Sequence, residues 1–129
     1  MEKQSITEKI KSFEDACAHL GIEPKLPEVE VLHPDHQKGV IAFYKLSVIA
    51  TALNEGWKPD WSNWNQKKWF PWWYVDASSS AFLAYAYTHY TATTAYAIFG
   101  SRLGFKTREL AQYAADQFKD LYEDLLLYK

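Results

Sequence analysis

The sequence is poor in the residues that form cross-links, metal cages and phosphate-binding loops. Its single cysteine, Cys17, excludes an intrachain disulfide and a cysteine-based metal site. The chain has only five glycines, and Gly100 and Gly104 do not have the spacing of a phosphate-binding loop. No strongly apolar run follows the N-terminal lysines, so we expect no export signal.

Charge of either sign is also scarce over residues 77–101, which contain no Asp, Glu, Lys or Arg. This segment is rich in Ser, Thr and Tyr and is therefore too polar for a membrane-spanning helix. The whole chain has a formal net charge of −2 and no basic cluster, which argues against binding to duplex nucleic acid. The 129 residues are 48% hydrophobic and 17% aromatic, so we expect one soluble domain, residues 1–129, with a packed core.

Apolar residues at helical spacing predict three helices. The first begins at Ser5, where Glu8 completes a capping box, and ends at Gly21. The second covers residues 34–54 and is apolar around most of its circumference, so it should be the central element. The third begins after the N-cap residue Thr107 and continues to about residue 128.

Aromatic and β-branched residues predict strands between the second and third helices. Residues 68–75 form the first, with Pro71 placing it at an edge or at a bulge. Residues 81–90 and 93–105 resemble two more strands, although their alanines leave a helical alternative open for residues 77–99. The predicted fold class is α+β, with three helices packed on a small antiparallel sheet of about three strands.

All six tryptophans lie in one stretch, "GWKPDWSNWNQKKWFPWW". Trp57, Trp69, Trp72 and Trp73 are candidates for the core, because each ring can bury a large apolar area. Trp61 and Trp64 lie among turn-forming polar residues and are candidates for ligand contact. A mixed aromatic and polar strand face would extend this ligand-binding surface, and its members are Tyr85, Tyr87, His89 and Tyr90.

Catalytic and metal-binding patterns are weak. The "HPDH" segment (His33, Asp35, His36) matches no zinc spacing and is better explained as a solvated helix start. Cys17 lies on an apolar helix face, where an inert thiol is expected. We therefore predict no catalytic residues, no metal and no cofactor. An enzyme with a site assembled around His89 is the weakest alternative.

The leading hypothesis is a non-enzymatic binding or structural module that presents its aromatic surface to a protein, a glycan or another copy of itself. The alternative is a single-stranded nucleic-acid-binding protein. In that alternative Trp61, Trp64 and Tyr85 stack on bases, and the phosphates are contacted by a basic set: Lys67, Lys68, Arg102, Lys106 and Arg108.

Two motifs, "ALNEGWKPDWSNWNQKKWFPW" and "GSRLGFKTRELAQYAADQF", resemble a group of uncharacterised small proteins encoded by phages and prophages of gut Bacteroidales. The resemblance covers residues 43–122. It implies a phage or mobile-element context, with a location in the host cytoplasm or in a virion. It supplies no catalytic residues.

Overall fold

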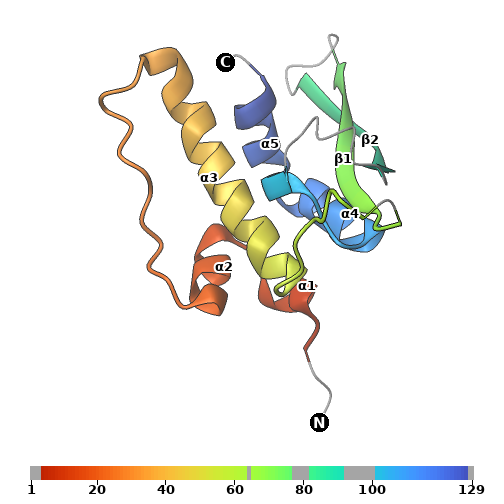
Figure 1. The fold of residues 1–129 in the computed structure, drawn as a ribbon. Coiled ribbons are helices and arrows are strands. Elements are labelled where there is room, and N and C mark those ends of the chain that lie inside the picture. The colour runs from red at the N-terminus through yellow and green to blue at the C-terminus, as the bar shows by residue number, and fades with distance from the viewer. Residues whose placement is uncertain (1–3, 64, 77–81, 92–100, 128–129) are drawn as a thin grey trace.

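The computed structural model describes residues 4–63, 65–76, 82–91 and 101–127, and this part of the chain is mostly helical (Figure 1). Its elements are α1 (Ile6–Lys9), α2 (Phe13–Leu20), α3 (Pro34–Asn54), β1 (Lys68–Asp76), β2 (Phe82–Thr91), the 3-10 turn η1 (Ser101–Leu103), α4 (Arg108–Gln117) and α5 (Lys119–Leu126). The prediction of three helices on a three-stranded sheet is therefore wrong. Two predicted helices are each divided in two, and the described strands form a two-stranded antiparallel ribbon.

The first predicted helix is interrupted at residues 10–12. Ser12 accounts for the break, because its hydroxyl accepts a hydrogen bond from the backbone N–H of Asp15 at 3.0 Å and caps a new helix, α2. The Asp15 carboxylate in turn accepts the backbone N–H of Lys11 at 3.0 Å. Ser5 is the N-cap residue of α1, as predicted, but its side chain makes no capping bond. The Ser12 cap thus begins a separate helix, although apolar residues keep helical spacing across the break.

The predicted central helix is confirmed as α3. Pro34 occupies its first turn, and the His33 ring accepts the backbone N–H of Asp35 at 3.1 Å. The helix ends where Glu55 and Gly56 adopt positive φ angles of 50° and 90°. α3 packs against both α2 and α5, and it supplies many of the buried apolar residues.

The last predicted helix is divided at Phe118. Thr107 caps α4 as expected, since its hydroxyl accepts the backbone N–H of Leu110 at 3.2 Å. Phe118 then leaves the helical conformation, with φ −118° and ψ 30°, and α5 follows directly. Its ring is buried in the core, so packing compensates for the interrupted helix.

The ribbon pairs β1 with β2 in antiparallel register, from Lys68 opposite Thr91 to Asp76 opposite Phe82. The register shifts between Trp72 and Trp73, next to Pro71, where the sequence predicts an edge or a bulge. Residues 93–100 of the predicted third strand lie outside the described residues. The rest of that segment forms η1 and an isolated bridge to β1.

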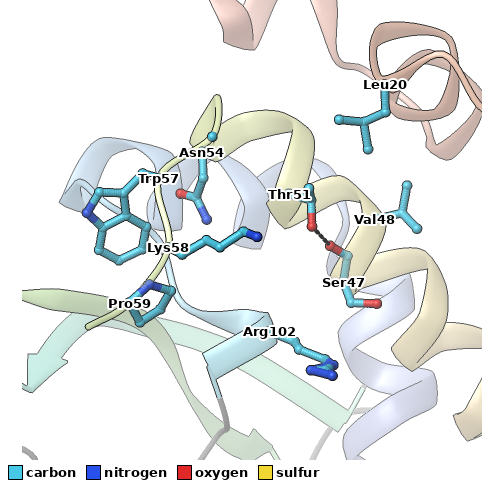
Figure 2. A pocket seen from close by; sticks show the side chains of 10 residues that line it. Leu20, Ser47, Val48, Thr51, Asn54, Trp57, Lys58, Pro59 and Arg102 are labelled. Atoms are coloured by element: carbon cyan, nitrogen blue, oxygen red, sulfur yellow. Dashed lines mark hydrogen bonds between the residues drawn. The ribbon is translucent and has the colours of Figure 1, made fainter. Parts of the chain in front are cut away.

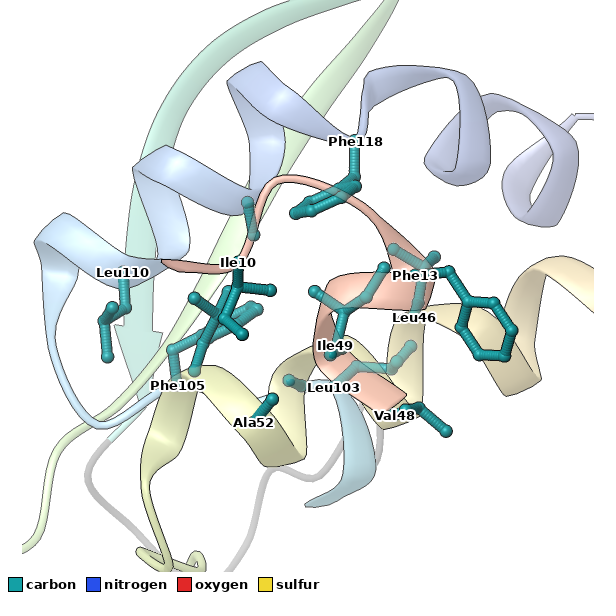
Figure 3. Close-up of a cluster of buried hydrophobic side chains, with 14 of the residues drawn as sticks. Ile10, Phe13, Leu46, Val48, Ile49, Ala52, Leu103, Phe105, Leu110 and Phe118 are labelled. Carbon is teal, nitrogen blue, oxygen red and sulfur yellow. The ribbon is translucent and has the colours of Figure 1, made fainter. Parts of the chain in front are cut away.

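The core lies where α3 meets the N-terminal helices, α4 and η1 (Figure 3). Ile49 and Leu53 of α3 are fully buried, and Phe105 after η1 is 1% exposed. None of the five described tryptophans belongs to this fully buried set; all are half-buried. Trp69 and Trp73 pack on the outside of the core, and Trp73 contacts the Tyr122 ring with centroids 5.4 Å apart. The tryptophan-rich stretch therefore borders the core and does not fill it.

Candidate functional site

A cavity with a volume of about 610 Å³ opens beside the C-terminal half of α3. Its walls come from the end of α2, from α3, from the segment that follows α3, and from η1 (Figure 2). A volume of this size is typical of a small-molecule site. The lining residues are Leu20, Ser47, Val48, Thr51, Asn54, Gly56, Trp57, Lys58, Pro59 and Arg102.

Two cations, Lys58 and Arg102, line this cavity, and among the described residues no carboxylate does. Figure 2 shows the Lys58 side chain extending across the space toward Thr51, while the Trp57 ring points to the other side of the chain. Both cations are exposed, and within the described part of the chain neither belongs to an ion pair. Walls that carry charge of one sign concentrate the field in a cleft, so this cavity attracts anions.

Two hydroxyl groups on α3 form the opposite wall. Ser47 Oγ donates to the carbonyl oxygen of Tyr44 at 2.9 Å. Thr51 Oγ1 donates to the carbonyl oxygen of Ser47 at 2.8 Å (Figure 2). A hydroxyl has one proton and two lone pairs. Because both protons are used within the helix, the remaining lone pairs leave the two oxygens able to accept hydrogen bonds.

Asn54 fixes the segment after η1 to the end of α3, and thereby supports the position of Arg102. It is 4% exposed; its Nδ2 donates to the carbonyl oxygen of Gly104 at 2.9 Å, and its Oδ1 accepts the backbone N–H of Lys106 at 3.0 Å. The Lys106 ammonium lies 3.7 Å from the Glu55 carboxylate, so this nearby acid is already paired. A buried amide with both ends bonded is a rigid support for the wall of a site.

The bridge between Phe105 and Trp69 holds the same segment to β1. Each residue donates its backbone N–H to the other's carbonyl oxygen, at 2.9 and 3.0 Å. The cavity wall is thus attached to both the helical body and the ribbon.

Between the cavity and β1, the chain folds around the ammonium group of Lys68. This side chain is fully buried, and its Nζ donates to the carbonyl oxygens of Asp60 at 2.7 Å and Asn63 at 3.2 Å. The same Nζ lies 5.0 Å from the centroid of the Trp61 ring, a cation–π distance. We call residues 58–68 the lysine-centred loop.

The polar side chains of the lysine-centred loop bond to its own backbone. The Asp60 carboxylate accepts the backbone N–H and the hydroxyl of Ser62, and these two bonds, followed by the charge of Lys68, lower the pKa of Asp60. Gln66 bonds back to Asp60 and Lys58. The turn-forming residues therefore hold the backbone of this loop in its conformation.

The predicted ligand-binding residues fall into two groups. Trp61 is half-buried over Lys68, and Trp64 lies outside the described residues. The other four belong to β2, where the backbone pairs them with aromatic residues of β1: Tyr85 with Trp73, Tyr87 with Trp72, His89 with Phe70 and Tyr90 with Trp69. Their role in ligand binding stays a prediction.

The single-stranded nucleic-acid hypothesis also stays a prediction, but the structure gives Lys68 a different task. Its ammonium group is buried and bonded within the loop, so it is not available to a phosphate. Arg102 faces the cavity.

Metal-binding and thiol chemistry are not supported in the described ranges. No group of three or more His, Cys, Asp or Glu side chains there is arranged to hold a metal ion. His33, Asp35 and His36 are exposed at the start of α3, as predicted. Cys17 is fully buried, and burial, with a smaller contribution from the Glu14 carboxylate, raises the pKa of its thiol.

Sequence reasoning missed Lys58 as a site residue, and it placed Arg102 only among phosphate contacts. No local motif contains both residues, because Lys58 precedes β1 in the sequence and Arg102 follows β2. The missed signal was the chain reversal after Asn54, which returns Lys58 toward α3.

Comparison with protein-family models, with curated proteins and with solved structures finds no match to this chain. Within the described residues, no helix combines the length and apolarity needed to cross a membrane, and this includes the 21-residue α3. The case for a function therefore depends on the cavity itself.

Proposed function

We propose that this protein is a binding module that holds an anionic ligand in the cavity between α3 and Lys58–Arg102. The observation that supports the proposal is a pair of cations that line one cavity; within the described part of the chain, neither belongs to an ion pair and no carboxylate lines the cavity. Arg offers a planar set of donors that matches carboxylate and phosphate oxygens, and Lys adds a mobile point charge.

The proposal is one of binding and not of catalysis. The described lining contains no thiol, imidazole or carboxylate that could act as nucleophile or general base beside the two cations. The phage or mobile-element context is part of the proposal and depends on the sequence resemblance alone.

Titration with inorganic phosphate at low ionic strength, followed by NMR amide shifts, tests the proposal. We expect saturable shifts at Lys58 and Arg102 that weaken as salt is added. Lys58→Ala and Arg102→Ala should each weaken binding by about 10- to 150-fold, because one charge-assisted hydrogen bond contributes roughly 1.5–3 kcal/mol. Lys11→Ala, an exposed lysine outside the cavity lining, is the matched control and should bind as the wild type does.

Two results would contradict the proposal. Shifts spread over the whole surface would indicate nonspecific attraction. Equal binding by Arg102→Ala and the wild type would show that the cavity is not the site.

A further inference from the structure

The donors and acceptors around the cavity define the ligand more narrowly than its charge does. On one side the Lys58 ammonium and the Arg102 guanidinium can only donate hydrogen bonds. On the other side the Ser47 and Thr51 oxygens can accept, because their protons are bonded to backbone carbonyls of α3. A ligand that satisfies both walls carries an anion at one end and hydrogen-bond donors at the other.

The ligand's donors must be uncharged. An ammonium group would satisfy the hydroxyl oxygens, but the same-sign charges of Lys58 and Arg102 would repel it. Neutral donors compatible with this field include hydroxyl groups and amide N–H groups; hydroxyl groups are the smaller of the two and can each donate one bond to Ser47 or Thr51. Leu20 and Val48 also line the cavity and offer apolar contacts to the C–H groups of such a ligand.

The ligand's anion should be a phosphate monoester. Two cations supply two positive charges, and a phosphate monoester carries about −1.5 to −2 at pH 7, whereas a carboxylate carries only one charge. Phosphate alone leaves most of a cavity of about 610 Å³ unfilled. Resting on the proposed anion-binding function, we infer that the cavity takes a phosphorylated polyol, with its phosphate at Lys58 and Arg102 and its hydroxyls at Ser47 and Thr51.

The test compares ribose 5-phosphate, inorganic phosphate and ribose as probes, with dissociation constants from NMR titration. We expect ribose 5-phosphate to bind more tightly than inorganic phosphate, by about 2- to 12-fold for each hydroxyl bond. Ribose without phosphate should bind far more weakly than either.

Substitutions on α3 test whether the tighter binding of ribose 5-phosphate comes from the Ser47 and Thr51 hydroxyls. Thr51→Val and Ser47→Ala should each weaken ribose 5-phosphate binding by about 2- to 12-fold, and should lower the ratio of ribose 5-phosphate affinity to phosphate affinity by the same factor. Thr51→Ser keeps the hydroxyl and is the matched control. Arg102→Ala should weaken both phosphate-bearing probes.

The outcomes separate the two proposals. If ribose 5-phosphate binds no better than phosphate, or if Thr51→Val leaves the ratio unchanged, the polyol inference fails while the anion-binding function stands. If neither phosphate-bearing probe shifts the cavity residues, both fail. A 5′-phosphorylated oligouridylate that binds more tightly than ribose 5-phosphate, and loses this advantage without its phosphate, would identify a nucleic-acid end as the source of the same chemistry.

Discussion

The helical body and the lysine-centred loop keep their shapes through different interactions. In the body, fully buried apolar side chains such as Ile49 and Leu53 pack against neighbouring helices. In the loop, a fully buried ammonium group bonds to two backbone carbonyl oxygens and lies against an indole ring. Apolar burial is tolerant of direction, whereas the bonds to Lys68 need each carbonyl to point at one atom.

The two regions supply different walls of the cavity. The body supplies α3 as one wall, and its hydroxyls are oriented by helical hydrogen bonds. The loop and η1 supply Lys58 and Arg102, which are exposed and carry the charge. Asn54 lines the cavity and joins the end of α3 to the segment after η1.

Shortening a buried side chain of the body should have the largest effect. Ile49→Ala removes a fully buried group of α3 and should lower the free energy of unfolding by about 2–5 kcal/mol. Urea unfolding followed by circular dichroism measures it. Val40→Ala on the same helix, where the side chain is 39% exposed, is the control and should change stability by no more than about 0.5 kcal/mol. Similar losses in both variants would contradict the described core.

Removing the charge at the centre of the loop should have the next largest effect. Lys68→Met keeps the length of the side chain but loses both bonds to Asp60 and Asn63, at a cost of about 1.5–3 kcal/mol. Hydrogen exchange should rise in residues 58–68 more than in α3. Lys58→Met, an exposed lysine of the same loop, should leave stability and exchange nearly unchanged. Equal protection of the loop in wild type and Lys68→Met would show that the buried ammonium does not hold it.

Helix capping gives a smaller contrast within the body. Ser12→Ala removes a capping bond of α2 and should cost about 1 kcal/mol. Ser5→Ala should cost less, because the Ser5 side chain makes no capping bond. Thermal unfolding of the two variants compares them directly. The opposite order would restore the continuous first helix predicted from the sequence.

The smallest effect should come from the exposed carboxylate of the loop. The Ser62 bonds lower the pKa of Asp60, so ionised Asp60 stabilises the loop above its ordinary pKa of 3.8, and this contribution is lost as the pH falls through the lower folded value. NMR titration of the carboxyl carbon should give a pKa that rises toward 3.8 in Ser62→Ala. An unchanged pKa in that variant would show that Ser62 is not the cause.

Local signals predicted the helices well and the sheet badly. The proline at the start of α3, the Glu55–Gly56 reversal and the Thr107 cap each act through neighbouring backbone groups, so they can be identified from the sequence. The breaks at Ser12 and Phe118 were missed because apolar periodicity continues across both. At Phe118 the helix is interrupted where the ring packs into the core, and this tertiary contact leaves no sign in the apolar spacing.

The cavity was still less predictable. Trp61 and Trp64 were expected to face a ligand because they lie among turn residues, but Trp61 lies over Lys68 and is half-buried. Lys68 was predicted to contact phosphates because lysines are usually exposed. Its burial depends on the carbonyl oxygens of Asp60 and Asn63, whose positions the sequence does not show.

The sequence by itself determined where the helical segments lie, the proline start of α3 and the Thr107 cap of α4, because these depend on residues within a few positions of one another. Only the tertiary structure decided which charged side chains are buried and which face a cavity. Lys58, Lys68 and Arg102 are all cations in the sequence, and their different environments come from the segments that fold around them. Desolvation and hydrogen-bond partners are set by contacts between distant segments, and no local pattern encodes those contacts.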